Sequence, residues 1–278
     1  MVITVLATAA MLTGQDEVAR HHLQGVKRIM ELRGGFAGFA DSVKLLVEML
    51  RIDIGLTLMT GQPPLFFHQP FAGPQLAHPQ PSGSRFAPSR AASFESLLPT
   101  LNGNLAYIWR SLRDFCKTVN TASRTQRRLP EQMLLDSMAS AVYPLLNMRF
   151  ECGSMSETCR LGLLAFCSNA FLQWQGMNVG YKSLPSFYRQ TLLRLGQSKE
   201  SVPPQAMLWL LMMGGIALFT GEEDRTWLLP WLEDVIGECT VVGWENVQDI
   251  LKSFLWVNFI HDRLGERLYS AAIGHNRI

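Results

Sequence analysis

The sequence has few charged residues for its length. Asp, Glu, Lys and Arg make up 17% of the 278 residues, whereas soluble domains usually contain about 25%. The formal net charge of +2 is too small to indicate a nucleic-acid surface by itself, because non-specific binding to DNA depends on clustered Lys and Arg. With 47% hydrophobic residues, much apolar surface must face other protein, either in a large core or at a partner.

The cysteines lack the spacing of a metal site or of a disulfide framework. Their number is odd and no CxxC pair occurs, the positions being Cys116, Cys152, Cys159, Cys167 and Cys239. Cys152, Cys159 and Cys167 recur at steps that put sulfurs on similar helix faces without closing a tetrahedral site. We therefore expect structural cysteines in a reducing compartment, with no bound metal or other cofactor.

Signatures of catalysis and of membrane insertion are also missing. The sequence contains no GxSxG, HExxH or GxxxxGK(S/T) motif. The apolar run over residues 208–219 is shorter than the roughly 20 residues that a membrane span needs. No basic residue precedes the apolar stretch at residues 2–12, as a secretory signal would require. We expect a buried helix there and no membrane partner.

What the sequence does contain is a succession of helical patterns without convincing strand alternation. We expect an all-α fold, a single domain over residues 1–278 built as an irregular bundle of about ten helices in antiparallel hairpins. The expected helices span residues 2–12, 16–32, 41–60, 100–122, 130–148, 155–175, 184–196, 204–219, 224–237 and 244–269. The Pro-, Gly- and Ser-rich stretch 68–93 is expected to be a flexible loop.

Single residues predict where helices end, bend or approach one another. Asp16 is the candidate N-cap of the second helix, and Gly34 and Gly35 suit a left-handed C-cap because they have no Cβ. Pro144 should kink or shorten its helix because it lacks an N–H. We expect Gly25 and the pair Gly214 and Gly215 to let helices pack closely, with Trp and Met filling the core or a ligand cavity.

His21 and His22, with Asp16 or Glu17 nearby, could suggest a metal site or an acid/base pair. A zinc site needs three or four converging ligands, and the other histidines are His68, His78, His261 and His275. We therefore expect His22 to form a local hydrogen bond in a helix contact and His21 to be solvated.

The acidic run Glu222, Glu223 and Asp224 could hold magnesium for prenyl diphosphate chemistry in an all-α enzyme. That chemistry needs paired aspartates one turn apart and a second acidic set on a facing helix, and the sequence shows neither. We expect these acids to begin a helix, where the helix dipole favours negative charge.

Two further sets of charged residues have structural explanations. Arg51 and Asp53 diverge by about 200° on a helix, so we expect each to pair with a different neighbouring element. The excess of basic residues at Arg124, Arg127 and Arg128, next to Arg110, Arg113 and Lys117, is expected to be a solvated helix end and loop.

Four stretches, in this order, carry a resemblance to a known family: ARHHLQGVKRIMELRGG, RIDIGLTLMTGQPPLFF, AMLWLLMMGGIALFTGEEDRTWLLPWL and ILKSFLWVNFIHDRLGERLYSA. They resemble the helical regulatory region, the fungal-specific transcription factor domain, that accompanies a Zn2Cys6 DNA-binding cluster. The similarity runs from about residue 5 to residue 272. The six-cysteine cluster itself is missing, so the sequence does not support direct zinc binding or DNA reading by this chain.

The resemblance implies a nuclear transcription-regulatory domain that contacts proteins of the transcription machinery or a second copy of itself, or responds to a small ligand. It implies DNA contact only through a separate N-terminal zinc cluster. We expect a truncated gene model, a fragment or a member that lost its DNA reader, and no enzymatic activity, hence no catalytic, cofactor or metal residues. The alternative is an all-α enzyme on an apolar substrate, with Glu222 to Asp224 or His22 near its site.

Overall fold

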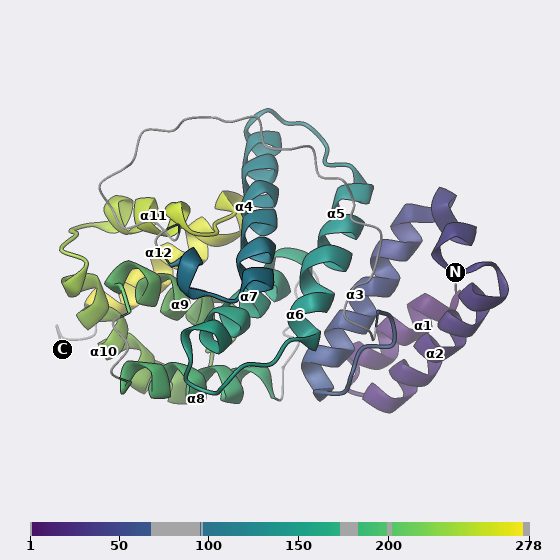
Figure 1. Cartoon of the computed structure of the whole chain (residues 1–278), viewed down its shortest axis with the longest axis horizontal. Coiled ribbons are helices and arrows are strands. Elements are labelled where there is room, and N and C mark those ends of the chain that lie inside the picture. Colours follow the sequence, from purple (N-terminus) through teal and green to yellow (C-terminus); the bar gives the residue numbers. More distant parts are fainter. Residues whose placement is uncertain (1, 68–94, 96, 173–182, 199–201, 275–278) are drawn as a thin grey trace.

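The computed structural model describes residues 2–67, 95, 97–172, 183–198 and 202–274, and within them helices are the only regular secondary structure (Figure 1). The α-helices are α1 (Val2–Leu12), α2 (Asp16–Leu32), α3 (Val43–Thr60), α4 (Gly103–Arg124), α5 (Glu131–Ser137), α6 (Tyr143–Asn147), α7 (Met155–Phe171), α8 (Leu184–Gly196), α9 (Pro204–Ala217), α10 (Glu222–Glu238), α11 (Trp244–Ser253) and α12 (Asn258–Gly274). The all-α prediction is confirmed. The predicted loop 68–93 lies outside the described residues.

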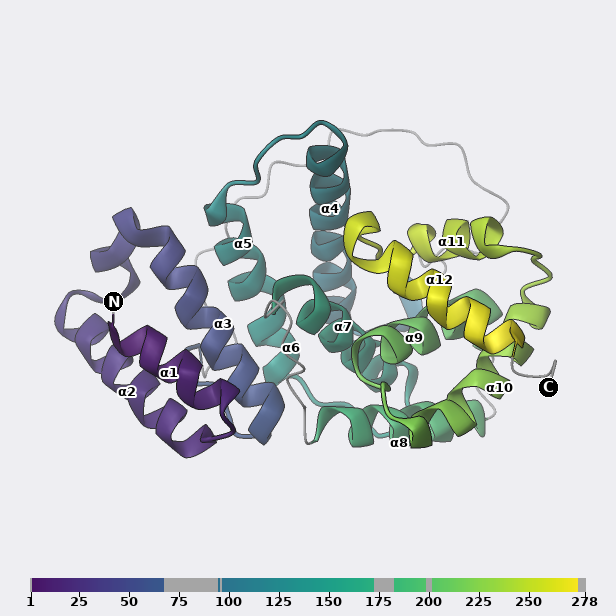
Figure 2. The ribbon, with the colours of Figure 1, turned by 180° about the vertical axis from the view of Figure 1, so that it is seen from behind.

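The helices form a broad, elongated bundle (Figures 1 and 2). The α1–α2 hairpin and α3 form one end, α4 to α7 the middle, and α8 to α12 the other end. Two apolar helices occupy the core of the larger part, since every residue of α7 from Glu157 to Ser168 and of α9 from Ala206 to Gly214 is buried. Trp109 of α4 packs edge to face on Trp209 of α9, with ring centroids 5.0 Å apart.

Helices α2 and α3 end where the sequence predicts, whereas the N-cap of α2 differs. Gln15 is the N-cap of α2 and Asp16 is the first helical residue, so the predicted N-cap is wrong by one position. Gly34 (φ 88°), Gly35 (φ 74°) and Gly61 (φ 75°) adopt the left-handed conformation, which side chains with a Cβ enter at a cost. These glycines stop α2 and α3 where the sequence predicts.

The helix around Pro144 continues through a change in its winding. A π-helical turn, η4 (Met138–Val142), joins α5 to α6 directly before Tyr143 and Pro144. Pro144 lacks an N–H and crowds the carbonyl one turn earlier in an α-helix, and the wider π turn relieves both constraints. The expected distortion is present.

The single helix predicted over residues 244–269 is wrong, because α11 ends at Ser253 and α12 begins at Asn258. Asn120 of α4 stabilises this break. Its Nδ2 donates to the Trp256 carbonyl at 2.8 Å, and its Oδ1 accepts from the Asn258 N–H at 2.9 Å. These partners lie more than 130 residues apart in sequence, so helical periodicity alone does not show the break.

The first helix is only half buried, which corrects the expectation for residues 2–12. Thr4, Ala7, Ala10 and Met11 face the interior. The opposite side carries Val2, Val5 and Leu6, which are 74%, 66% and 45% exposed. An apolar helix normally buries its whole circumference, so this exposed side needs an explanation.

Close helix packing was expected at three glycines, and the structure shows it at two of them. A Cβ at Gly214 would overlap the Phe219 ring, and one at Gly215 would overlap the Leu268 side chain and lie 3.0 Å from Cδ2 of Leu228. A Cβ at Gly25 would meet no heavy atom within 4 Å. Close packing is therefore confirmed at the paired glycines, and it is wrong for Gly25 within this chain.

We expect Gly214→Ala to lower the free energy of unfolding by about 1 to 3 kcal/mol, because the added methyl group overpacks the core. The matched control is Gly237→Ala, where nothing lies within 4 Å of the new Cβ. That variant should gain about 0.5 kcal/mol from helix propensity. Urea denaturation measures both changes, and equal effects would contradict the packing explanation.

Candidate functional site

One buried polar cluster surrounds Asp53 of α3, which is 1% exposed. Its Oδ1 accepts the Leu65 N–H at 2.7 Å, and its Oδ2 accepts the Phe66 N–H at 3.0 Å. The hydroxyl of Tyr143 on α6 donates to Oδ2 at 2.9 Å. One carboxylate therefore joins α3, the segment after it and α6.

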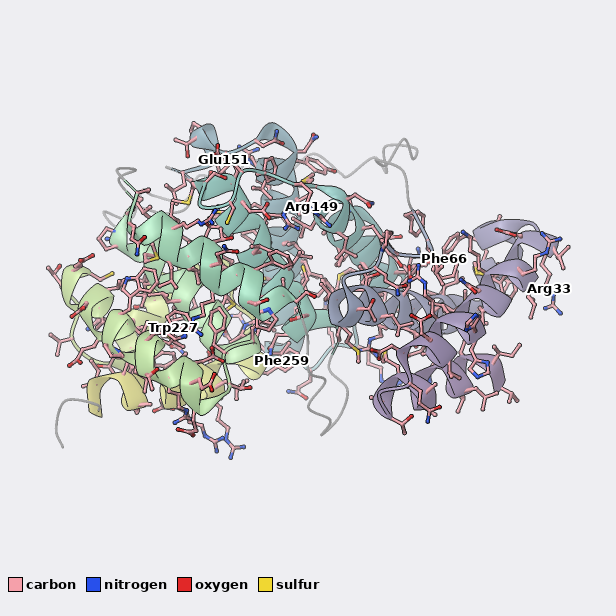
Figure 3. All side chains as sticks on the ribbon, turned by 90° about the horizontal axis from the view of Figure 1, so that it is seen from below. Arg33, Phe66, Arg149, Glu151, Trp227 and Phe259 are labelled. Atoms are coloured by element: carbon pink, nitrogen blue, oxygen red, sulfur yellow. The ribbon has the colours of Figure 1, made fainter. Side chains whose placement is uncertain are left out.

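Neighbouring helices also hold the carbonyls of this segment. The donors are Arg20 Nη2 to Pro63 (3.0 Å), Lys27 Nζ to Leu65 (2.9 Å) and Asn147 Nδ2 to Phe67 (3.0 Å). Leu65 and Phe66 are buried beneath them. Phe66 lies where the α1–α3 end meets the middle helices (Figure 3). Residues 61–67 thus form a strap that is fixed through its main chain from α2, α3 and α6.

Burial raises the pKa of Asp53 from 3.8 to about 6, although the Leu65 and Phe66 N–H groups and the Tyr143 hydroxyl lower it. Burial, with the neighbouring Asp53, raises the pKa of Tyr143 well above its usual value. The Tyr143 hydroxyl and the Asp53 carboxylate are hydrogen-bonded to each other.

Arg51 has a different partner from Asp53, because its Nε donates to the Phe171 carbonyl at 2.7 Å. The expectation that Arg51 and Asp53 take different partners is confirmed.

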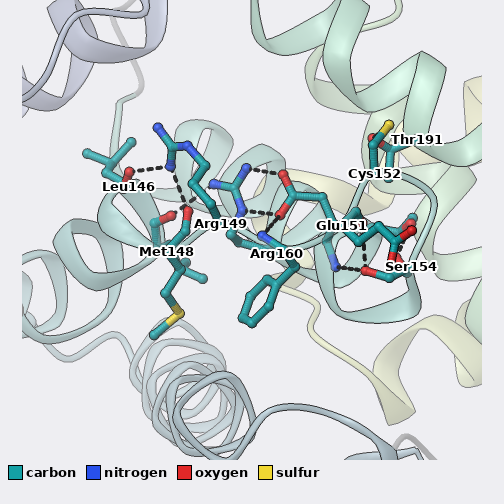
Figure 4. Close-up of polar contacts among 12 residues, drawn as sticks. Leu146, Met148, Arg149, Glu151, Cys152, Ser154, Arg160 and Thr191 are labelled. Carbon is teal, nitrogen blue, oxygen red and sulfur yellow. Dashed lines mark hydrogen bonds and ion pairs between the residues drawn. The ribbon is translucent and has the colours of Figure 1, made fainter.

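A second buried cluster fixes the connection between α6 and α7 (Figure 4). Arg160 forms a two-pronged ion pair with Glu157, at 2.7 Å from Nε and 2.6 Å from Nη2. Its Nη1 donates to the Leu145 carbonyl at 2.9 Å, while Glu157 accepts the Phe150 N–H at 3.1 Å. These contacts lead to the main chain of α6 and of the connection or to the paired side chain, so this is a structural ion pair.

Arg149 lies at the edge of the same cluster and donates to the Leu146 and Met148 carbonyls, both at 2.6 Å. Desolvation lowers the pKa of Arg149, and the positive charge of Arg160 lowers it further. In Figure 4 the Arg149 guanidinium points toward the end of α6. The side chain therefore closes the C-terminal carbonyls of that helix, a role favoured for cations at helix ends.

His261 is fully buried at the start of α12, between the Phe166 and Trp256 rings. Its Nδ1 accepts the Val257 N–H at 2.9 Å, which places the proton of the neutral ring on Nε2. Burial lowers the pKa of His261 to about 3. The ring is thus a neutral helix cap, and a nitrogen already engaged as an acceptor does not serve as a general base.

The residues considered for metal or acid/base chemistry are not brought together. His21 is exposed and its Nδ1 lies 2.9 Å from the Glu17 carbonyl oxygen, while His22 is half-buried. The predicted local hydrogen bond therefore belongs to His21, not His22. Figure 1 places α2 and α10 at opposite ends of the bundle.

The acids of α10 occupy its first three helical positions, as the sequence predicts. Asp224 accepts from Trp227 Nε1 at 3.4 Å, and Glu222 lies 3.9 Å from Arg225. Both partners belong to the same helix. Among the described residues, no group of three or more His, Cys, Asp or Glu side chains is arranged to hold a metal ion.

The five cysteines are free thiols, and all except the half-buried Cys152 are buried. Burial raises the pKa values of Cys116 and Cys159 to about 12, so these thiols stay protonated. Thiolates are the nucleophiles and metal ligands. The four buried cysteines therefore pack as small apolar groups, as the sequence analysis expects, while the Cys152 sulfur lies 3.5 Å from the Thr191 hydroxyl.

The basic residues Arg124, Arg127 and Arg128 are exposed at the end of α4 and in the turn after it, which confirms a solvated helix end. Nearby, Arg113 pairs with Glu95, and Lys117 lies 3.2 Å from Asp114. These pairs reduce the positive charge along α4.

A contact surface that the sequence analysis missed lies on the α1–α2 hairpin. On α2, Val18, Gly25 and Leu32 recur every seven residues and are all exposed. Together with Val2, Val5, Leu6 and Ala9 of α1 they define what we call the hairpin face. The α1 part of this face carries no charge, whereas the exposed His21 and Arg28 lie between its α2 members at steps of three and four residues. The lack of charge in α1 was the sequence signal that could have indicated this contact surface. Separately, none of the described helices is long and apolar enough to cross a membrane.

We expect Glu157→Ala to lower the free energy of unfolding by about 3 kcal/mol or more, because it leaves the buried Arg160 charge without its partner. The control is Glu31→Ala, which removes the exposed pair with Arg28 at 3.5 Å. That change should cost less than about 0.5 kcal/mol. Chemical denaturation of both variants measures the difference, and similar losses would contradict the assignment.

The raised pKa of Asp53 predicts a pH dependence of stability. The folded chain holds this proton more tightly than the unfolded chain, so the contribution is present below pH 3.8 and is lost as the pH rises to about 6. Wild type should therefore lose about 3 kcal/mol relative to Asp53→Asn across this range. His261, whose lowered pKa has the opposite effect, is present in both proteins and cancels. Denaturation of both proteins at several pH values measures the difference, and a constant difference would refute the prediction.

Comparisons with protein-family models, with curated proteins and with solved structures find no match for this chain. The resemblance in the four sequence stretches therefore remains a prediction.

Proposed function

We propose that this chain is a transcription-regulatory helical domain that acts through protein contacts. The observation that carries the proposal is the hairpin face at one end of the bundle, above all its uncharged apolar side on α1. Exposed apolar surfaces of this kind are typical of protein interaction sites.

The packing of the interior supports a role through contact. Asp53 and Tyr143 fix the strap, Glu157 and Arg160 fix the α6–α7 connection, and His261 caps α12. The carboxylates, the phenol and the guanidinium are explained by the groups that they hold, whereas the buried Nε2 of His261 has no hydrogen-bond partner. The surface remains as the place where a partner can act.

The four resembling stretches support the transcriptional part of the proposal. They cover α2, the α3 helix with its strap, the α9–α10 pair and the α11–α12 pair. Their characteristic residues have packing roles: Gly214 and Gly215 lie under neighbouring side chains, and Trp256 Nε1 donates to Asp262 at 2.6 Å. A nuclear location, protein partners of the transcription machinery and DNA contact through a separate zinc cluster belong to this proposal.

The enzyme alternative has no observation in its favour in the described part of the chain. It would need the α10 acids or His22 beside an apolar substrate in the core. The acids begin α10 at the surface, and His22 lies on α2 at the other end of the bundle.

A reporter assay tests the proposal. Residues 1–278 are fused to an unrelated DNA-binding domain, and we expect reporter expression in a fungal host to change several-fold relative to that domain alone. The double variant Val5→Asp and Leu6→Asp should abolish the change, because it places two charges on the hairpin face. Expression and nuclear import of each fusion are checked by immunoblotting and imaging.

The matched control is Val242→Asp, which alters a valine that is 87% exposed and lies outside the hairpin face. This variant should regulate the reporter as wild type does. A wild-type fusion that is nuclear and leaves the reporter unchanged would overturn the proposal.

A further inference from the structure

We propose that the exposed side of α4 and the turn after it bind the phosphate backbone of double-stranded DNA without reading its sequence. The surface consists of Arg110, Lys117, Arg124, Arg127 and Arg128, which are all exposed and which we call the α4 basic face. It is separate from the hairpin face, which lies on α1 and α2 at one end of the bundle (Figure 1). The inference therefore goes beyond the proposed function and does not rest on it.

The positive charge of the chain is concentrated in this segment. Residues 103–130 contain six Lys and Arg residues and one Asp, which gives a formal charge of +5. The whole chain has a formal charge of +2, so the other residues together have −3. No acidic residue occurs between Asp114 and Glu131. The nearly neutral total thus hides a strongly basic region, and a one-sided charge distribution of this kind is typical of nucleic-acid surfaces.

Most of these charges have no counterion within the chain. Among the described residues, no ion pair involves Arg110, Arg124, Arg127 or Arg128. Lys117 lies 3.2 Å from Asp114, but both side chains are more than 60% exposed, so water and salt screen their attraction. The α4 basic face therefore keeps its positive charge for a ligand.

The shape of the α4 basic face suits a long, straight partner. Arg110, Lys117 and Arg124 recur every seven residues, a step that keeps them along one side of the helix. Arg110 and Arg124 are 14 positions apart, which corresponds to about 21 Å along the axis. A DNA duplex presents about 12 phosphates over this length. Figures 1 and 2 show the C-terminal end of α4 reaching beyond α5 and α11, which leaves it accessible to such a partner.

The turn after α4 fixes the main chain that carries the last two arginines. Gln126 adopts the left-handed conformation, with φ 53°, which residues with a Cβ enter at a cost. Its N–H donates to the Ser123 carbonyl at 3.3 Å, and the Arg127 N–H donates to the Ala122 carbonyl at 2.9 Å. These are the hydrogen bonds of a Schellman motif. Arg127 and Arg128 therefore leave the helix end in a defined direction.

The helix dipole explains only part of this charge pattern. Cations are favoured within the last turn of a helix, and Arg124 is the last residue of α4. Lys117 and Arg110 lie about two and four turns earlier, where this effect has decayed. Their positions on the same exposed side as Arg124 are explained by a shared ligand.

The composition of the face favours DNA over an acidic protein. Every exposed residue from Arg110 to Arg128 is polar or charged, whereas the centre of a protein interface is apolar. Protein–DNA interfaces are more polar and much more positively charged. Guanidinium groups also match phosphate oxygens, because they can donate two parallel hydrogen bonds to them.

The packing of α4 favours contact with the phosphates and not with the bases. The side opposite the α4 basic face is buried, with Trp109 only 1% exposed. A helix held in this way presents one side to a duplex and cannot insert fully into a groove. Contacts to phosphates position a protein on DNA but carry no sequence information directly. We therefore expect binding that is independent of sequence.

Fluorescence anisotropy of a labelled 20-base-pair duplex, titrated with the purified full chain, tests the inference. At 50 mM KCl we expect a dissociation constant of about 10 µM, which is typical of non-specific binding. Two duplexes of unrelated sequence should bind equally well. Five phosphate contacts predict that the logarithm of the association constant falls with the logarithm of the salt concentration with a slope of about −4.5.

The triple variant Arg124→Gln, Arg127→Gln and Arg128→Gln removes three of the five contacts. Its affinity for the duplex should fall by at least 10-fold, and the slope should change to about −2. All three residues are exposed, so the variant should remain folded, which circular dichroism and thermal unfolding check.

The matched control is Arg28→Gln with Arg33→Gln and Lys44→Gln, which removes the same charge from exposed positions at the α1–α3 end. Its affinity should stay within 3-fold of wild type, with an unchanged slope. Equal losses in the control and in the α4 variant would refute the inference, because net charge alone would then explain the binding. Wild type that does not bind either duplex at 200 µM would also refute it.

Two further outcomes would contradict specific parts of the inference. Labelled polyglutamate that binds the chain more tightly than the duplex does would identify an acidic protein as the partner and overturn the assignment to DNA. A preference of more than 10-fold for one duplex over the other would show contact with the bases and contradict binding through the phosphates alone.

This test and the reporter assay fail independently, because the reporter fusion has its own DNA-binding domain. A reporter response together with a purified chain that does not bind DNA would refute this inference and leave the proposed function standing. DNA binding through the α4 basic face by a chain whose fusion leaves the reporter unchanged would refute the proposed function alone.

Discussion

The hydrogen bonds to the Asp53 carboxylate organise the contact between the α1–α3 end and the middle helices. Asp53 receives two main-chain N–H groups of the strap and the hydroxyl of Tyr143, which lies 90 residues further along the chain. A buried carboxylate is tolerated only when its acceptor positions are satisfied. The strap, α3 and α6 must therefore be in place together, which makes this contact specific as well as stabilising.

The sequence predicts most of the helices because their apolar periodicity and their terminal glycines are local signals. Gly34, Gly35 and Gly61 end helices where expected, and α8 spans the predicted residues. The break at residues 254–257 was not predictable, because it depends on Asn120 from a distant helix. The sequence also does not show which side of α1 is buried, because its apolar residues occur on every side of the helix.

For the polar residues, too, the sequence predicts what depends on helical spacing and does not predict partners on distant helices. Helical spacing correctly separates Arg51 from Asp53, but it does not reveal that Asp53 binds Tyr143 or that Glu157 pairs with Arg160 inside the core. His261 is one of six histidines in the sequence, and only its burial beside Trp256 identifies it as a neutral cap. These side chains are explained by the groups that they hold in place.

The π turn η4 has a consequence for the strap. A π turn accommodates one residue more than an α-helical turn, and one residue corresponds to about 100° of rotation around the axis. The side chains after Val142 are therefore rotated relative to those of α5, and Tyr143 is the first of them. Removing one residue from η4 would restore an even winding and swing the phenol ring away from the carboxylate. The contact between the α1–α3 end and the middle helices therefore depends on the winding of this one turn.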